Sequence, residues 1–266
     1  VPEERSLMNP IPPRTFQVGA LSVRVYSSQA DLAADGGGLV AGILRDVLAR
    51  QSSAAVILAS ATSQIQFLDA LVAAPGIEWS RVTLFHMDEY LGITDQHPAS
   101  FRRFLRERVE ARVRPAAFHY VAGEAAEPLS ECDHYAALLQ AQPIDLCCLG
   151  IGENGHLAFN DPPVADFKDP RTVKLVKLDE ACRQQQVGEG CFPTLESVPQ
   201  YAYTLTIPTL CAARRVVGVV PERRKAVAVR DALVGPISEA CPASVLRLQA
   251  HATLLLDADS AALLPT

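Results

Sequence analysis

The sequence predicts an α/β fold in which one domain is built on a mostly parallel sheet with helices on both faces. Apolar segments of strand length alternate along the chain with longer segments whose apolar residues recur at helical spacing. Several of these strand segments carry almost no polar residues, which indicates that they are buried on both faces. No internal repeat or linker divides the 266 residues, a length that suits a single large core.

The first half of the chain supplies three predicted strands and four predicted helices. The strands are predicted at residues 21–26, 54–59 and 82–85, and the helices at 31–50, 64–73, 97–113 and 129–140. Three consecutive glycines at 36–38 weaken the early part of the first helix. Residues 1–16 are rich in proline and charge, and we expect them to form an extended arm ahead of the domain at 17–266.

The second half of the chain continues the same alternation, with one looser region. Strands are predicted at residues 144–151, 172–178, 201–207, 215–220 and 252–256, and helices from Pro221 and at 244–249. Apart from the strand at 172–178, residues 161–199 contain no long periodic segment. A loose insertion of this kind beside a site is a candidate lid.

Composition excludes several classes of protein. The net charge is −6 and no basic stripe is present, so nucleic acid is not an expected partner. No apolar segment reaches transmembrane length and the first residues lack the apolar centre of a signal peptide, so we expect a cytoplasmic protein without a membrane partner. The seven cysteines include no Cys-x-x-Cys pair, which predicts free thiols and no metal cluster.

A first group of polar residues follows the predicted strand at 144–151. Glycines stand at 150, 152 and 155, and the turn also carries Glu153, Asn154, His156 and Asp161. Glycine allows sharp turns and close approach of a ligand. A histidine and acids in such a turn are typical of a site at the carboxyl edge of a parallel sheet. The alternative is a tight turn with a solvated histidine.

A second group follows the predicted strand at 82–85, where His86, Asp88, Glu89 and Tyr90 are clustered. Adjacent acids directly after a buried strand indicate either a cap or a function. The alternative here is a helix N-cap formed by Asp88. Two strand ends of the same kind favour the functional interpretation, and predict that Asp88 and His156 face one pocket at the ends of neighbouring strands.

These two groups resemble the glucosamine-6-phosphate deaminase (isomerase) family over about residues 22–257. The resemblance is carried by Met87-Asp88-Glu89-Tyr90 with Gly92, His97-Pro98-Ala99-Ser100, Gly150-Ile151-Gly152-Glu153-Asn154-Gly155-His156 and Ala158-Phe159-Asn160-Asp161-Pro162. The related 6-phosphogluconolactonases share the glycine-histidine motif more loosely and usually lack the Met-Asp-Glu-Tyr run. The resemblance implies a single Rossmann-like domain, an amino sugar phosphate as substrate and no metal or organic cofactor.

The resemblance also implies roles for individual residues. His156 would move a proton between the anomeric hydroxyl and the ring oxygen, and Asp88 would move a proton from C2 to C1. A neutral histidine can donate and accept near pH 7, and a desolvated aspartate is a stronger base. Asn154 would orient the imidazole through its side-chain oxygen, and Asp161 would supply the orienting carboxylate. The products would be fructose 6-phosphate and ammonia, the reaction of a hydrolase/isomerase of amino sugar catabolism.

The phosphate is expected in a hydroxyl-rich loop and beside one lysine. Ser60, Ala61, Thr62 and Ser63 follow a strand and open a helix, where N–H groups and the helix dipole favour an anion. A plain N-cap is the alternative. Lys225 stands at the start of a helix, where a cation opposes the dipole, and the family places a phosphate-binding lysine there. Glu89 is expected among the substrate-binding residues.

Three departures from the family and two alternative functions accompany this interpretation. The family often has aspartate at Asn154 and glutamate at Asp161, and its phosphate-binding arginine has no certain match, although Arg183 is nearby. A lactonase would use His156 and water without Asp88, and a non-catalytic sugar-phosphate sensor would keep only the pocket. The sequence leaves the glucosamine and galactosamine epimers open, and a homo-oligomer is possible.

Overall fold

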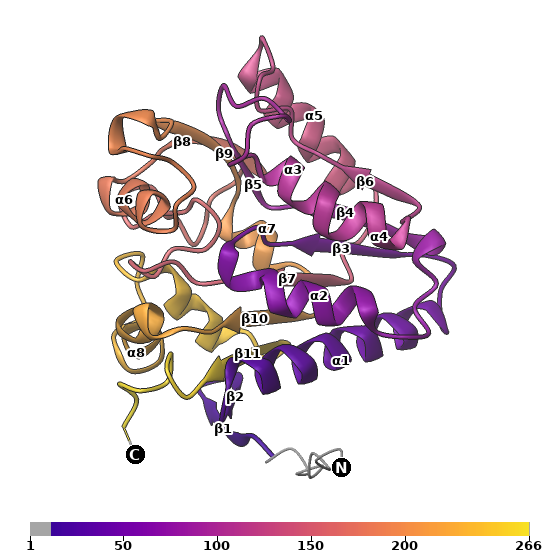
Figure 1. Ribbon diagram of the computed structural model, residues 1–266, viewed down its shortest axis with the longest axis vertical. Coiled ribbons are helices and arrows are strands. Elements are labelled where there is room, and N and C mark those ends of the chain that lie inside the picture. Colours follow the sequence, from indigo (N-terminus) through magenta and orange to yellow (C-terminus); the bar gives the residue numbers. More distant parts are fainter. Residues whose placement is uncertain (1–11, 266) are drawn as a thin grey trace, which may run out of the picture.

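The computed structural model describes residues 12–265, which form a twisted sheet covered by helices (Figure 1). In spatial order the eight strands of this sheet are β1 (Arg14–Val18), β2 (Leu21–Tyr26), β11 (Ala252–Asp257), β10 (Val216–Val220), β7 (Leu146–Leu149), β3 (Ala54–Leu58), β4 (Val82–His86) and β6 (Ala117–His119). Only the pairing of β1 with β2 is antiparallel. The prediction of a mostly parallel sheet is therefore confirmed.

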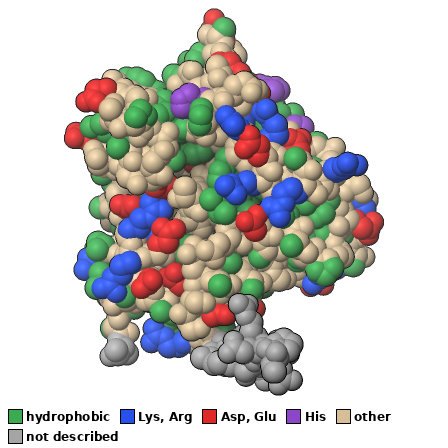
Figure 2. Space-filling model, viewed as in Figure 1, with side chains coloured by type: hydrophobic (Ala, Val, Ile, Leu, Met, Phe, Trp, Pro, Cys, Tyr) green, Lys and Arg blue, Asp and Glu red, His purple; other side chains and the backbone are tan. Residues whose placement is uncertain are grey.

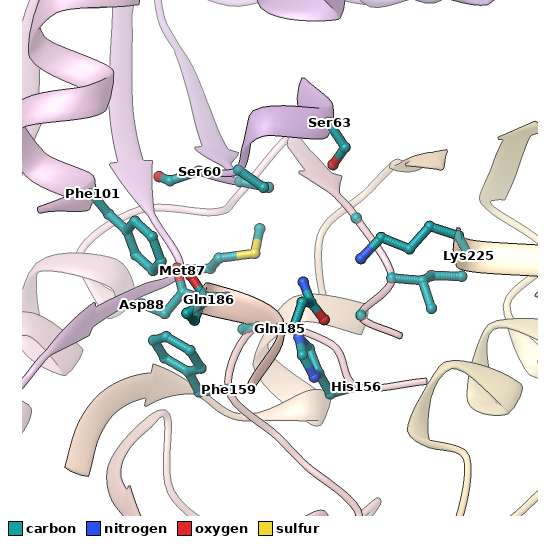
Figure 3. A pocket seen from close by; sticks show the side chains of 16 residues that line it. Ser60, Ser63, Met87, Asp88, Phe101, His156, Phe159, Gln185, Gln186 and Lys225 are labelled. Atoms are coloured by element: carbon teal, nitrogen blue, oxygen red, sulfur yellow. The ribbon is translucent and has the colours of Figure 1, made fainter. Parts of the chain in front are cut away.

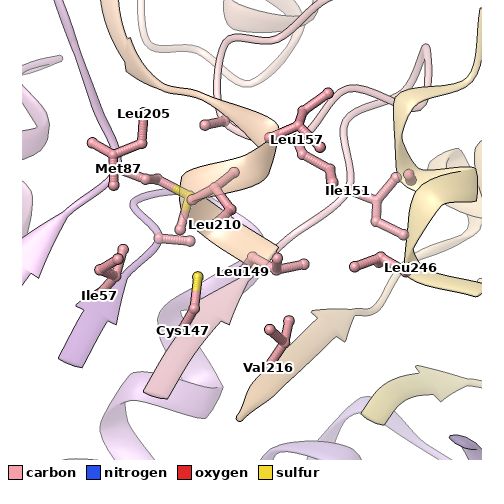
Figure 4. Close-up of a cluster of buried hydrophobic side chains, with 14 of the residues drawn as sticks. Ile57, Met87, Cys147, Leu149, Ile151, Leu157, Leu205, Leu210, Val216 and Leu246 are labelled. Atoms are coloured by element: carbon pink, nitrogen blue, oxygen red, sulfur yellow. The ribbon is translucent and has the colours of Figure 1, made fainter. Parts of the chain in front are cut away.

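Helices cover both faces of the sheet, as predicted. One face carries α1 (Gln29–Leu48), α2 (Ile65–Ala73) and the helix formed by α3 (Phe101–Leu105), a π-helical turn (Arg106–Glu110) and α4 (Ala111–Val113). The other face carries α5 (Pro128–Gln140), α7 (Ile207–Cys211) and α8 (Ala226–Val234). Successive strand residues point to opposite layers. Ile57, Cys147 and Val216 thus enter the core of the second face (Figure 4).

A second, antiparallel sheet lies beyond the main sheet and was not foreseen. It consists of β5 (Asp88–Tyr90), β9 (Tyr201–Leu205) and β8 (Val173–Lys177), in that order. With α6 (Glu180–Gly188) it forms a separate apolar cluster that includes Tyr90, Phe159 and Phe192. The segment predicted as a loose lid therefore contains a strand and a helix, and is held by a small core of its own.

Several element boundaries differ from the prediction. Strand β1 starts at Arg14, inside the segment predicted as an arm, while residues 1–11 lie outside the described part of the chain. The helix predicted from residue 97 begins at Phe101, because the Ser100 hydroxyl accepts a hydrogen bond from the Arg103 N–H and caps it there. The helix predicted from Pro221 opens as a 3₁₀ turn, Arg223–Lys225, and residues 242–248 form a second such turn.

The cysteines and the helices bear on two further expectations. All seven cysteines are free, and four of them are buried as small apolar side chains. This confirms the prediction of free thiols. Between residues 12 and 265, no helix combines the length and the apolar character that crossing a bilayer requires.

Helix α1 runs without a break through the three consecutive glycines at 36–38, and its contact with α2 explains two of them. A Cβ atom on Gly37 would lie 2.8 Å from the Cβ of Ala70 and 2.9 Å from the Leu71 nitrogen. Gly36 is buried as well, next to Phe67 and Leu255. Tertiary packing therefore outweighs the low helix propensity of these positions. Gly38 is exposed, and nothing lies within 4 Å of its hypothetical Cβ.

We expect opposite effects from alanine at neighbouring glycines of α1. Gly38→Ala should raise the free energy of unfolding by about 0.5–1 kcal/mol, because alanine is the better helix former and meets no neighbour. Gly37→Ala should lower it by on the order of 1–3 kcal/mol, because the added methyl group forces α1 away from α2. Urea unfolding followed by circular dichroism measures both. Equal effects at the two positions would contradict this account of the helix contact.

Candidate active site

A cavity opens at the carboxyl ends of four adjacent strands, β10, β7, β3 and β4. The segments that follow these strands contribute Lys225, His156, Ser60 and Asp88, respectively, to its lining (Figure 3). The predicted meeting of Asp88 and His156 in one pocket is thus what the structure shows. Their strands, β4 and β7, are separated by β3 and are not direct neighbours.

Asp88 lies at one end of the cavity, on the first residue of β5. Its residue is only 7% exposed, and its Oδ1 has no hydrogen-bond partner among the described residues. Burial, and secondarily the charge of Glu89, raises the pKa of Asp88 well above its ordinary value. The rings of Phe101 and Phe159 stand near it (Figure 3). A desolvated carboxylate in an apolar wall is suited to accept a proton.

Glu89 does not line the cavity, so its predicted place among the substrate-binding residues is wrong. Alternate side chains of a strand point to opposite faces, and that of Glu89 points toward the N-terminus of α3. Its carboxylate accepts hydrogen bonds from the Ser100 hydroxyl at 2.8 Å and from the backbone N–H groups of Phe101 and Arg102 at 3.2 and 3.0 Å. It caps this helix and anchors the strand that carries Asp88.

His156 is held by a turn that only glycine permits at two positions. A Cβ atom on Gly152 would lie 2.2 Å from ring atoms of His156, so the imidazole rests directly on this glycine. Gly155 has a φ of +84°, and a Cβ there would also meet the Cys241 sulfur at 2.7 Å. The Gly152 N–H donates to the carbonyl of His156 at 3.0 Å, which closes the turn. The glycine pattern thus places the ring in the cavity.

Asp161 and Asn154 stand behind His156, but Asn154 contacts groups other than the imidazole that it was predicted to orient. Asp161 Oδ1 lies 2.9 Å from His156 Nδ1, although the ring N–H is not aligned for a regular hydrogen bond. Such bonds commonly align when substrate binds. Asn154 donates to the Asp161 carboxylate at 3.1 Å, and its oxygen accepts from the backbone N–H of His156. Asn154 therefore orients the carboxylate and the turn, and does not touch the imidazole.

The charge of Asp161 is stabilised although the side chain is fully buried. Burial alone would raise the pKa of Asp161, but the interactions with His156, Asn154 and the Asp179 N–H outweigh it and lower this pKa. An ionised Asp161 favours a proton on His156 Nδ1 and leaves Nε2 for chemistry in the cavity.

Cys182, on α6, approaches the same pair. One ligand atom from each of His156, Asp161 and Cys182 lies within 4.8 Å of the others, which is a possible metal-binding arrangement. The sequence-based expectation that no histidine and thiol converge is therefore wrong at this point. Burial, and then the Asp161 carboxylate, raises the pKa of the Cys182 thiol well above its ordinary value. A protonated thiol at this place is a neutral neighbour of the carboxylate.

The opposite end of the cavity is suited to an anion. Ser60, Ala61 and Ser63 line it together with Lys225, whose side chain extends into it (Figure 3). The Ser60 hydroxyl is buried and has no hydrogen-bond partner within residues 12–265. Burial lowers the pKa of Lys225, and the charge of Glu189 is the strongest influence in the other direction. A bound phosphate would raise this pKa again, because it favours the charged ammonium.

Two further residues define how this end is built. Gln64 is 1% exposed, and its amide donates to the carbonyl of Val219 at 2.9 Å, which ties the loop after β3 to the end of β10. Thr62 does not line the main cavity. It lies on a smaller neighbouring cavity, and its hydroxyl contacts Glu189 at 3.2 Å. The predicted hydroxyl loop is thus divided, with Thr62 on the outer rim.

Helix α6 contributes two lining residues, Gln185 and Gln186, that the sequence reasoning missed. Gln186 accepts a hydrogen bond from the Tyr90 hydroxyl at 2.7 Å, and Gln185 accepts from the Glu153 N–H at 3.0 Å. The spacing of the least exposed side chains in this segment, at 182, 185, 186 and 189, is that of one helical face. Two of these four side chains are glutamines, so no apolar periodicity marked the helix in the sequence.

Arg183, which the sequence left open as an uncertain match for the family's phosphate-binding arginine, lies outside the cavity lining. Its guanidinium donates to the carbonyl oxygens of Leu195 and Val198, at 2.5 and 3.1 Å, and so closes the loop after α6. The cation beside Lys225 is instead Arg224, which contacts Thr62 at 3.4 Å.

Comparison with known proteins agrees with this geometry. The family described as glucosamine-6-phosphate isomerases/6-phosphogluconolactonase matches residues 27–255 of this chain. The glucosamine-6-phosphate deaminase of Pseudarthrobacter chlorophenolicus is 34% identical over 233 residues, which cover 86% of this chain and 88% of that protein. The glucosamine-6-phosphate deaminase of Exiguobacterium sibiricum is 37% identical over 188 residues, 71% of this chain and 73% of that protein.

Solved structures show the same fold. A monomeric glucosamine-6-phosphate deaminase superposes with a TM-score of 0.83 at 28% identity, over 91% of this chain and 99% of that chain. The 6-phosphogluconolactonase of Thermotoga maritima superposes with a TM-score of 0.73 at 16% identity, over 89% of this chain and 99% of that chain. Together with the match over residues 27–255, these findings show that the chain belongs to the glucosamine-6-phosphate isomerase/6-phosphogluconolactonase family.

Proposed function

We propose that the protein converts glucosamine 6-phosphate and water to fructose 6-phosphate and ammonia. The observation that carries this proposal is the shared cavity in which Asp88 and His156 face the substrate space, with Lys225 at the anion end. The named relatives at 34–37% identity support it. The description as a hydrolase is too broad, because the central step is an isomerisation that ends in loss of ammonia.

Ring opening is the task of His156 in this proposal. The Asp161 carboxylate, 2.9 Å from Nδ1, favours a proton on that nitrogen. Nε2 then accepts the proton of the anomeric hydroxyl and returns it to the ring oxygen, so no net proton is consumed. The product of this step is the open-chain aldehyde. A neutral imidazole can both accept and donate this proton near pH 7.

Isomerisation is the task of Asp88. In the open chain its carboxylate removes the proton from C2, the electron pair moves toward the C1 carbonyl, and the carbonyl oxygen takes a proton from the substrate's ammonium group to give an enolamine with a hydroxyl on C1. The protonated Asp88 then returns the proton to C1, which yields an imine at C2. Water adds to this imine and ammonia leaves, so the ketone of fructose 6-phosphate is formed. The raised pKa of Asp88 makes it a better base for this step.

A lactonase is the less favoured function. Hydrolysis of a lactone requires a base and water, but no transfer of a proton between two carbon atoms. The second carboxylate, Asp88, is 7% exposed and lacks a partner at Oδ1, and such a costly group is explained by the isomerisation and not by hydrolysis. The resemblance to solved lactonases, at 16% identity, concerns the fold alone.

The decisive experiment supplies glucosamine 6-phosphate to the purified protein and assays ammonia and fructose 6-phosphate. Stoichiometric release of both is expected. A parallel reaction with 6-phosphogluconolactone tests the lactonase, and calorimetric binding without turnover would indicate a sensor. Turnover of the lactone together with failure on the amino sugar would refute the proposal.

Replacing Asp88 by Asn should separate chemistry from binding. Asp88→Asn keeps the shape but cannot accept the C2 proton, so the rate should fall by on the order of 10²–10⁴. Exchange of the C2 hydrogen with solvent deuterium, followed by NMR, should disappear while the sugar still binds. Exchange at the wild-type rate would show that Asp88 is not the base.

The same carboxylate predicts the pH dependence of activity and stability. The base is active when deprotonated, so kcat/KM should fall on acidification at a pH well above the ordinary aspartate pKa of 3.8. The folded state holds this proton more tightly than the unfolded state does, so the Asp88 contribution to stability is lost as pH rises through the raised pKa. Asp88→Asn should therefore increase the free energy of unfolding near neutral pH.

Replacing His156 by Gln should cause a smaller defect of a different kind. Ring opening also occurs in water without catalysis, so His156→Gln should slow the reaction without abolishing it. C2 exchange should slow but persist, in contrast to Asp88→Asn. The measurement is the ratio of the rate with freshly dissolved cyclic substrate to the rate with an analogue enriched in the open form. If that ratio stays at its wild-type value in His156→Gln, the imidazole has no role in ring opening.

Replacing Lys225 by Ala should mainly weaken binding of the phosphorylated sugar. The lost ammonium contributes a charge-assisted contact, so KM should rise by about tenfold or more while kcat changes less. The matched control is Lys174→Ala, which removes a lysine whose ammonium pairs with Asp169 and does not line the cavity. An unchanged KM for Lys225→Ala would remove the lysine from the anion site.

A further inference from the structure

Glu189 stands at the end of α6 with its side chain 3% exposed, next to the anion end of the cavity. Its carboxylate accepts hydrogen bonds from the Arg224 guanidinium at 2.7 Å, from the Gln185 amide at 2.7 Å and from the Thr62 hydroxyl at 3.2 Å. We call Glu189, Arg224 and Thr62 the clasp. It joins three segments that are far apart in the sequence.

The clasp connects both halves of the anion site to the helix that covers the cavity. Thr62 belongs to the loop after β3, and Arg224 directly precedes Lys225 after β10. A smaller cavity is lined by Ser60, Thr62 and Glu189, among others, and shares Ser60 with the main cavity. Figure 2 shows acidic and basic side chains gathered side by side on the surface between the regions of α6 and α8.

Charge makes the clasp sensitive to a phosphate. Glu189 exerts the strongest stabilising charge on the Lys225 ammonium, so its carboxylate already acts on the group expected to bind the anion. A sugar phosphate carries about −1.5 to −2 charges and has three strong acceptor oxygens. It therefore repels Glu189 and is a stronger partner for a guanidinium than one carboxylate is. Arg224 and Thr62, the donors that Glu189 occupies, are the groups for which such an anion would compete.

We propose that Glu189 is an internal counter-anion of the phosphate site, and that the substrate's phosphate displaces it from Arg224 and Thr62 and thereby releases the C-terminal end of α6. This inference rests on the proposed function, because it assigns a phosphate to the anion end. It makes Arg224 a second cationic ligand of the phosphate and Glu189 a residue that determines specificity. A sugar without phosphate cannot compete with Glu189 and leaves α6 in place.

The test measures binding of inorganic phosphate by isothermal titration calorimetry. Glu189→Gln keeps the size and polar contacts of the side chain but removes the competing charge, so the Kd for phosphate should fall by about three- to tenfold. The matched control is Glu222→Gln, since Glu222 also pairs with Arg224, at 2.5 Å, but lies outside α6 and does not contact Thr62. Its Kd should stay within about twofold of wild type.

Each outcome decides the question. A lower Kd for Glu189→Gln, with little change for Glu222→Gln, supports the displacement. An unchanged or higher Kd for Glu189→Gln overturns it, because Glu189 would then only brace the helix. Absence of phosphate binding in every variant overturns both this inference and the phosphate assignment. Tighter phosphate binding without ammonia release from the amino sugar would refute the proposed activity and leave the displacement standing.

A second measurement uses the wild-type protein and so avoids any folding defect of a variant. The backbone N–H groups of Glu189, Gly190 and Cys191 close the last turn of α6 through bonds of 2.9 to 3.0 Å. Phosphate should speed their hydrogen exchange several-fold, since loss of the clasp frees this turn. Slower exchange in the presence of phosphate would contradict the inference.

Discussion

The parallel direction of four adjacent strands is the constraint on which this site depends. Strands β10, β7, β3 and β4 all end at one edge, so the segments that follow them must emerge side by side. Residues separated by more than a hundred positions, such as Ser60 and Lys225, are brought together by this geometry. The Gln64 bond to the carbonyl of Val219 fixes two of these segments relative to each other.

Two adjacent acids show how the fold assigns opposite roles to the same chemical group. Strand alternation sends Asp88 into the cavity and Glu89 into the body of the protein. Glu89 receives four hydrogen bonds, from Tyr90, Ser100, Phe101 and Arg102, whereas Oδ1 of Asp88 receives none from the described residues. The hydrogen-bonded carboxylate of Glu89 stabilises the backbone that holds Asp88 in place. The carboxylate of Asp88, which has few such bonds, keeps its basicity.

The sequence predicted site residues well at the ends of the parallel strands. It predicted them less well in the segment that covers the cavity and contains β8 and α6. Asp88 and His156 were singled out because buried strands and a glycine turn are local signals, whereas the choice of Ser60 and Lys225 for the anion depended on the family resemblance. Glu89 was misplaced because β5 has only three residues and pairs with a strand more than a hundred residues away. Helix α6 was missed because its inner face carries glutamines, which give no apolar periodicity. The atoms that Asn154 contacts depend on tertiary geometry, which spacing does not reveal.

The position of Cys182 makes its thiol a probe for movement of the covering helix, α6. The thiol is 1% exposed, its pKa is raised, and it lies beside His156 and Asp161. A thiol reagent reaches it only when α6 moves away, so the rate of alkylation at this residue measures how often the helix opens. One sulfur atom thus records the opening of α6 in the time course of a single labelling reaction.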